Sequence, residues 1–147
     1  MSTPGTQPIR ILVIDDQPVV RVGIRAVLHS NTSMSVVGEA ANRDEGLALA
    51  SSEQPDVILL DLNLGNDNGL DLLPELRRAA PRAKVLILTG LHSVEIHKQA
   101  VRRGAMGVVL KEQDPGVLIE AIFSGHAGNI WVDSSLMSSL LNDEPAG

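Results

Sequence analysis

The chain has 147 residues, 44% of them hydrophobic and 1% aromatic, which fits one domain whose core is built from Val, Ile, Leu and Ala. Its formal net charge of -6 argues against general nucleic-acid binding, and the absence of cysteine excludes disulfides, thiolate metal sites and cysteine nucleophiles. The first ten residues lack a signal-peptide stretch and every apolar run is strand-sized, so we expect a soluble, cytoplasmic protein without membrane contact.

The first predicted strand covers residues 9–14, and a helix follows it with Pro18 near its start. Residues at helical spacing predict one apolar stripe on this helix: Val19, Val22, Gly23, Ala26 and Val27. A second strand is expected at residues 35–38. Asn42 followed by Glu45 resembles a capping box, which opens a second helix through Leu47 and Ala50.

The third predicted strand covers residues 56–60 and is nearly continuous in Val, Ile and Leu. A third helix carries a leucine stripe and ends at Ala80-Pro81; its members are Leu70, Leu73 and Leu76. After a fourth strand at 84–88, a fourth helix runs from about Ser93 to Arg103. Its inner face is expected to consist of Val94, His97, Ala100 and Val101.

The fifth strand is expected at residues 106–110, and Asp114-Pro115 supplies a cap and a first-turn proline for a fifth helix. Near the C-terminus, Asp133 is a plausible cap for one short amphipathic helix around residues 134–141. A lone helix of this length is marginal in water, so it should dock on the domain or pair with a second copy. Trp131 either anchors this helix or belongs to a partner interface.

Five strand-then-helix units with short connections indicate an α/β fold with a parallel sheet and helices on both faces. A flavodoxin-like strand order fits the size. We expect a disordered tail at residues 1–8, the domain at 9–127, and a linker with a short helix at 128–147.

Residues that can bind a metal or take part in catalysis lie at the ends of four of the five predicted strands. Asp15-Asp16 follow the first strand, Asp61 the third, Thr89 ends the fourth and Lys111 follows the fifth. In an open α/β sheet, sites lie outside the carboxyl ends of the strands. The four positions therefore predict one site at one edge of the sheet.

The residue types at this edge suit phosphoryl chemistry. Clustered carboxylates repel one another unless a proton or a cation lies among them, and hard oxygen ligands suit Mg²⁺. An aspartate can attack phosphorus to form an acyl phosphate. Such a reaction depends on in-line positioning and on positive charge near the moving oxygens, from a metal and a lysine.

This ordered set resembles the receiver domain of bacterial response regulators, from about Ile9 to about Gly125. The resemblance implies a CheY-like five-stranded sheet of order 2-1-3-4-5. It also implies that a phosphoryl group is accepted by Asp61 and contacted by Thr89 and Lys111. The Mg²⁺ ligands it implies are Asp16, Asp61 and the backbone carbonyl of Asn63, with Asp15 assisting through water.

The segment that ends in Lys111-Glu112, with the linker helix after it, is most similar to the NarL/FixJ class. That class implies a sensor histidine kinase as phosphodonor, a homodimer on phosphorylation, and DNA contact only through a downstream LuxR-type helix-turn-helix domain that these 147 residues do not include. The chain would be a signalling domain that switches transcription and not a conventional enzyme.

Two positions depart from the family pattern. Val108 occupies the position at which the family often carries an aromatic switch residue. We therefore expect the conformational change at this position to be weaker or to use other residues. Gly65 stands where proline is common, in a loop rich in Gly and Asn that predicts turns.

Three other interpretations compete with this one. Each of these residues, taken singly, suits a purely structural role as a cap, turn or surface charge. A phosphohydrolase with an Asp nucleophile is a second possibility, although Asn63 would replace its usual acid/base residue. A pseudo-receiver that acts only through protein contacts is the third.

Overall fold

The structure, a computed structural model, describes residues 7–142. The elements along the chain are β1 (Ile9–Ile14), α1 (Pro18–His29), β2 (Met34–Ala40), α2 (Arg43–Glu53), β3 (Val57–Leu60), β4 (Asn63–Leu64), β5 (Asp67–Asn68), α3 (Gly69–Ala79), β6 (Lys84–Thr89), α4 (Val94–Arg102), β7 (Gly107–Leu110), α5 (Pro115–His126) and α6 (Ser134–Leu141). The predicted tail at 1–8 lies mostly outside the described residues, as do residues 143–147 of the predicted linker.

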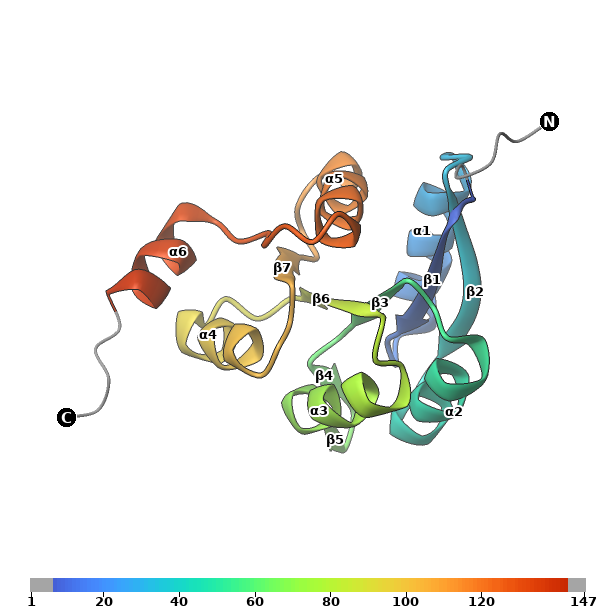
Figure 1. The fold of residues 1–147 in the computed structure, drawn as a ribbon, viewed down its shortest axis with the longest axis horizontal. Coiled ribbons are helices and arrows are strands. Elements are labelled where there is room, and N and C mark those ends of the chain that lie inside the picture. The colour runs from blue at the N-terminus through green and yellow to red at the C-terminus, as the bar shows by residue number, and fades with distance from the viewer. Residues whose placement is uncertain (1–6, 143–147) are drawn as a thin grey trace.

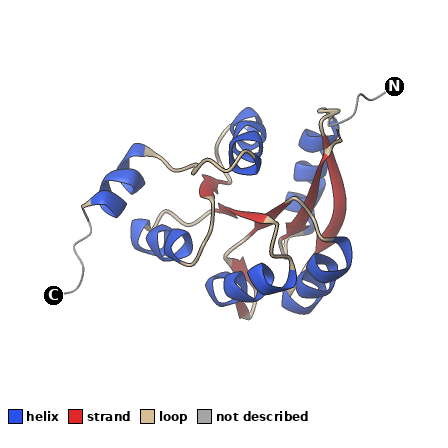
Figure 2. Ribbon diagram, viewed as in Figure 1, coloured by secondary structure: helices blue, strands red, loops and turns tan. Residues whose placement is uncertain are grey.

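One five-stranded sheet organises the molecule, in the order β2-β1-β3-β6-β7 with every neighbouring pair parallel. The α/β class and the CheY-like strand order are thereby confirmed, since β4 and β5 form only a separate two-residue hairpin. Helices cover both faces of the sheet (Figures 1 and 2). Within residues 7–142 no helix is both long and apolar enough to cross a bilayer.

The core has two layers because the central strands are apolar on both faces. One layer packs α1 and α5 against the sheet, through residues that include Ile24, Leu28 and Ile122. The other packs α2, α3 and α4 on the opposite face, where Leu73 and Leu76 are fully buried. The leucine stripe predicted for the third helix is therefore confirmed.

The predicted apolar stripe of the first helix is mostly wrong, although its member Val27 is partly buried and packs on the core. Val19 is 83% exposed and Val22 is 56% exposed, whereas the helix buries Ile24 and Leu28. The helix carries two apolar stripes, and the longer Ile and Leu side chains occupy the core face. An exposed apolar surface on α1 is the consequence.

The inner face predicted for the fourth helix is partly wrong in the same way. His97 and Ala100 are buried, but Val94 is 41% exposed in the first turn. The predicted capping box at the second helix is confirmed: the Asn42 side chain accepts from the Glu45 N–H at 2.9 Å, and the Glu45 carboxylate accepts from the Ala41 N–H at 2.8 Å.

The loop after Asp61 explains why glycine replaces proline there. Gly65 has a φ of 66° in the turn between β4 and β5, whereas a proline ring fixes φ near −65°. Proline is therefore excluded from this hairpin as it is built.

The linker docks on the domain in two places. The Trp131 N–H donates to the Met106 carbonyl at 3.0 Å and the Val108 N–H donates to the Trp131 carbonyl at 2.9 Å, so the segment extends the sheet beyond β7. Asp133 caps α6 by accepting from the Leu136 N–H at 2.7 Å, and Leu136 is buried where α6 packs on α4. Trp131 thus anchors the linker, and docking on the domain is the arrangement observed.

Candidate functional site

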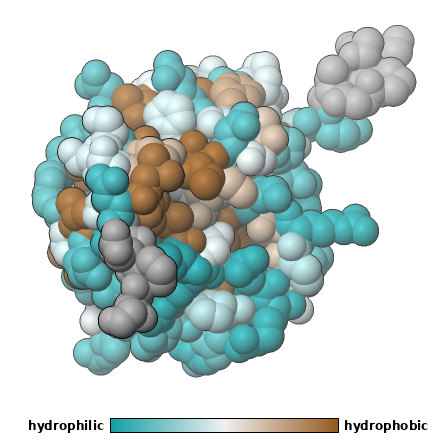
Figure 3. Space-filling model, turned by 60° about the vertical axis from the view of Figure 1, so that its left-hand side comes forward, coloured by the Kyte–Doolittle hydropathy of each residue, from teal (hydrophilic) through white to brown (hydrophobic). Residues whose placement is uncertain are grey.

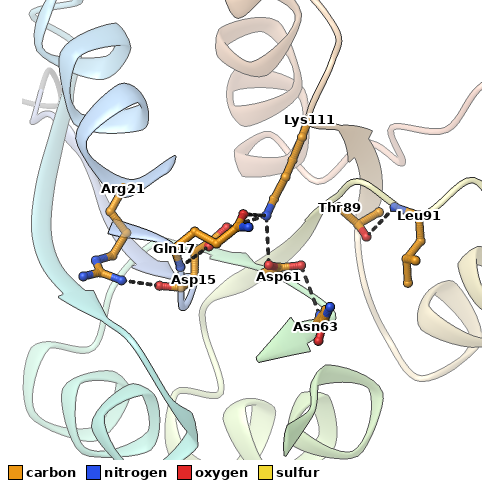
Figure 4. Close-up of polar contacts among 8 residues, drawn as sticks. All are labelled: Asp15, Gln17, Arg21, Asp61, Asn63, Thr89, Leu91 and Lys111. Carbon is orange, nitrogen blue, oxygen red and sulfur yellow. Dashed lines mark hydrogen bonds and ion pairs between the residues drawn. The ribbon is translucent and has the colours of Figure 1, made fainter. Parts of the chain in front are cut away.

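The predicted site residues meet at the carboxyl edge of the sheet. Asp61 follows β3, and β1, β6 and β7 bring Asp15, Thr89 and Lys111 to the same edge (Figure 4). An open cavity of about 220 Å³ lies above them, lined by Asp16, Gln17, Asp61, Asn63, Thr89, Gly90, Leu91 and Lys111. Adjacent parallel strands produce this convergence, because their carboxyl ends share one edge.

Lys111 is the positive centre of the site. Its Nζ donates to Asp61 Oδ2 at 2.9 Å and to Gln17 Oε1 at 3.1 Å, and it lies 2.9 Å from Asp15 Oδ2 (Figure 4). Asp15 and Asp61 are almost completely buried, at 1% and 4% exposure. One ammonium therefore balances two buried carboxylates across the junction of β1, β3 and β7.

Backbone N–H groups fix both carboxylates. Asp61 Oδ1 accepts from the Asn63 N–H at 3.1 Å, and Asp15 Oδ1 accepts from the Gln17 N–H at 2.9 Å. The Asp61 N–H itself donates to the Ile14 carbonyl at 2.9 Å, which ties Asp61 to β1. Each carboxylate is therefore held in a short turn at the end of its strand.

Burial dominates the electrostatics of Asp61. Burial raises the pKa of Asp61 above its usual value, although the hydrogen bonds from Lys111 and the Asn63 N–H oppose this rise. Burial lowers the pKa of Lys111, but its hydrogen bond to Asp61 and the negative charges of Asp61 and Asp15 outweigh burial and leave that pKa raised. Lys111 is therefore charged, while the ionised form of Asp61 needs further positive charge.

The acidic cluster fits a divalent cation. One carboxylate oxygen from each of Asp15, Asp16 and Asp61 lies within 4.8 Å of the others. Asp15 Oδ2 is buried and accepts no hydrogen bond within the described part of the chain, although the Lys111 ammonium is close. A buried carboxylate oxygen without a hydrogen bond is costly, and a bound ion or its water would satisfy it.

Thr89 and Val108 lie apart from this cluster. Thr89 is fully buried and its Oγ1 accepts from the Leu91 N–H at 3.1 Å, so the hydroxyl faces the loop after β6 (Figure 4). Val108 does not line the cavity above Asp61; it lines a second cavity between β7, α4 and α6. The structure thus brings together the acidic residues and Lys111, places Thr89 at their rim, and leaves Val108 outside.

Gln17 is a site residue that the sequence interpretation missed. It lines the cavity above Asp61 and accepts from Lys111, yet its residue type carries no chemical signal of its own. Its position directly after Asp15-Asp16 was the available signal, because it occupies the same strand end.

Comparison with known proteins agrees with this geometry. A family model for the response regulator receiver domain matches residues 11–123. The chain is 36% identical over 130 residues to the nitrate/nitrite response regulator protein NarL of Escherichia coli K12, covering 88% of this chain and 60% of that protein. It is 38% identical over 120 residues to the uncharacterized transcriptional regulatory protein YxjL of Bacillus subtilis, covering 82% and 55%.

A solved structure is similar over nearly the whole chain. It is a two-component response regulator of the LuxR family from Aurantimonas sp. SI85-9A1, with a TM-score of 0.84 and 30% identity over 92% of this chain and 96% of that one. The chain spans less than two thirds of the length of the two curated relatives named above.

Proposed function

Because this chain belongs to the response regulator receiver family, with NarL- and LuxR-type relatives, we propose that it accepts a phosphoryl group on Asp61 in an Mg²⁺-dependent reaction. The observation that carries the proposal is the placement of the Asp61 carboxylate. It lies at the base of an open cavity, 2.9 Å from the Lys111 ammonium and beside two further carboxylates.

In the proposed reaction, an Asp61 oxygen attacks phosphorus, and the bond from phosphorus to the donor breaks: P–N in a phosphohistidine, P–O in acetyl phosphate. The imidazole or acetate leaves, and an acyl phosphate remains on the chain. Lys111 moves from its carboxylate partners toward the phosphoryl oxygens and stabilises their charge. The Thr89 hydroxyl turns to donate to another of these oxygens. Bound Mg²⁺, held by Asp16, Asp61 and the Asn63 carbonyl with Asp15 assisting, would supply the remaining positive charge.

The proposed phosphodonor is a sensor histidine kinase. A groove of about 260 Å³ opens between α1 and α5 beside the acceptor site, and its lining residues include Val20, Leu118 and Lys111. The exposed Val19 and Val22 on α1 add apolar surface nearby. Both features favour a helical partner that delivers its phosphohistidine to Asp61.

The proposed output is a change in transcription through a downstream DNA-binding domain. Its support is the named function of the relatives, among them a transcriptional regulatory protein.

Homodimer formation on phosphorylation belongs to the same proposal. On the side of α6, Figure 3 shows apolar side chains at the surface, and the exposed apolar residues of α5, α6 and the segment between them are Phe123, Ile130, Met137 and Leu141. The cytoplasmic location remains a prediction from sequence.

The test is phosphorylation by acetyl phosphate with Mg²⁺, followed by intact mass. The wild type should gain one phosphoryl group, the Asp61→Asn variant none, and the exposed control Asp44→Asn one at the wild-type rate. EDTA should abolish the gain. Equal labelling of Asp61→Asn would refute the assignment, and turnover of many equivalents of a phosphoester per chain would favour the phosphohydrolase alternative.

A further inference from the structure

Two hydrogen bonds connect the acceptor cavity to a buried histidine on α4. Leu91 lies in the loop between β6 and α4, and its N–H donates to Thr89 Oγ1 at 3.1 Å. The Leu91 carbonyl lies 2.8 Å from His97 Nε2, which therefore carries a proton, because a carbonyl only accepts. His97 is 7% exposed. One loop residue thus bonds to Thr89 on one side and to His97 on the other.

His97 also lines the second cavity. This cavity has a volume of about 150 Å³, and its lining includes His97, Val108, Trp131 and Leu136. Core side chains normally leave few voids larger than a water molecule. Val108 is a small residue here, and it leaves room beside His97 into which the imidazole can move.

Linker residues form another part of the lining of this cavity. Trp131 pairs with the backbone of β7 on both sides of Gly107, and Leu136 is 2% exposed where α6 packs on α4. A Cβ atom at Gly107 would lie 2.3 Å from the Trp131 carbonyl oxygen, so only glycine permits this approach. His97 therefore lies between the Thr89 loop and both attachment points of the linker.

We propose that His97 couples phosphoryl occupancy of Asp61 to the docking of the linker, residues 129–141. The proposal rests on the proposed function. As the Thr89 hydroxyl turns toward the phosphoryl group, it loses the bond from the Leu91 N–H. The loop then shifts, the Leu91 carbonyl leaves His97, and the freed imidazole moves into the cavity and loosens α6 from α4.

A direct route from Thr89 through residue 108 has less support. Val108 has no polar side-chain atom with which to follow the threonine, and it is 9% exposed against the linker. His97 has a hydrogen bond to the loop after β6 and lines a cavity into which it can move. It is a positioning residue, since it touches neither the acceptor nor the phosphoryl group.

The only tryptophan of the chain, Trp131, reports on linker docking, and there is no tyrosine to interfere. Acetyl phosphate and Mg²⁺ are added to the full chain, and intact mass and Trp131 emission are followed in the same sample. In the wild type, emission should change in proportion to the phosphorylated fraction. His97→Phe should be phosphorylated at the wild-type rate but lose most of the emission change.

Two further variants distinguish a loss of coupling from a general disruption of the fold. His29→Phe, a matched change on the exposed end of α1, should respond like the wild type. His97→Gln retains an amide donor for the Leu91 carbonyl and should restore most of the emission change. Hydrogen exchange of the wild type gives a readout that needs no variant: amides of residues 134–141 should exchange faster after phosphorylation.

The outcomes are distinguishable. If no phosphoryl mass is gained, the proposed function fails. If the mass is gained while Trp131 emission and α6 exchange stay unchanged, the linker coupling is overturned although the proposed function stands. A full emission change in phosphorylated His97→Phe overturns the role of His97, and a His97→Gln chain that responds no better than His97→Phe overturns the role of its hydrogen bond.

Discussion

Replacement of Asp16 by Asn should stabilise the metal-free domain. The ligand oxygens of Asp15, Asp16 and Asp61 lie within 4.8 Å of one another, and Lys111 contacts Asp15 and Asp61 but forms no ion pair with Asp16 among the described residues. Two unit charges 4.8 Å apart repel by about 3.5 kcal/mol at an effective dielectric constant of 20, and by about 0.9 kcal/mol in bulk water. Since the cavity is open and Lys111 offsets part of the repulsion, the Asp16→Asn gain should be about 1–3 kcal/mol.

Bound Mg²⁺ should offset the stability advantage of Asp16→Asn over the wild type. A cation that binds only the folded state adds about 1.4 kcal/mol at ten times its Kd and about 2.7 kcal/mol at one hundred times. The wild type should gain this stability with Mg²⁺, and Asp16→Asn should gain much less because it has lost one ligand. Urea unfolding with EDTA and with Mg²⁺ measures both free energies.

An exposed carboxylate outside the cluster provides the control. Asp114 precedes α5 and makes no side-chain cap hydrogen bond, so Asp114→Asn should change the free energy of unfolding by less than about 0.5 kcal/mol, with or without Mg²⁺. Two results together refute the electrostatic reasoning. In EDTA, Asp16→Asn would be no more stable than Asp114→Asn; with Mg²⁺, it would gain as much free energy of unfolding as the wild type.

Three further predictions concern packing and charge elsewhere. Leu136→Ala should lower the free energy of unfolding by about 2 kcal/mol or more, because the Leu136 side chain is buried. It should also speed proteolytic cleavage after α5. Urea unfolding and proteolysis that match the wild type would contradict the docking of α6. Gly107→Ala should displace Trp131 and shift its emission to the red, since the new Cβ would meet the Trp131 carbonyl; an unshifted spectrum counts against the pairing. The hydrogen bonds from Arg25 lower the pKa of Glu39 in the folded protein. This ion pair therefore stabilises the fold fully above the pKa of the unfolded carboxyl, about 4.3. The stabilisation is lost as the pH falls through the lower pKa of Glu39 in the folded state. Glu39→Gln should therefore cost at most about 1 kcal/mol at pH 7 and nothing below both values, as measured by urea unfolding against pH.

The sequence predicted the fold and the convergence of the site residues because both depend on strand order. Apolar runs identify the buried strands, and parallel order then brings Asp15, Asp61 and Lys111 to one edge whatever the loops do. The geometry bears this out through the two 2.9 Å contacts of Lys111.

Other features depended on side-chain choices that spacing does not encode. The first helix has two apolar stripes, and only packing decides that Ile24 is buried while Val19 is exposed. The Gln17 contact depends on where a flexible amide turns. The pairing of Trp131 with β7 is too short to give a strand period, and it depends on the missing side chain of Gly107.

The most direct test of the central claim is to locate the phosphoryl group. After reaction with acetyl phosphate and Mg²⁺, borohydride reduces an acyl phosphate to an alcohol, and peptide mass spectrometry then identifies the modified residue. We predict reduction at Asp61 alone, in a peptide that keeps Asp67 and Asp71 unmodified. Reduction at Asp15 or Asp16 with Asp61 intact, or no reduction in a chain that has gained phosphoryl mass, would contradict the account.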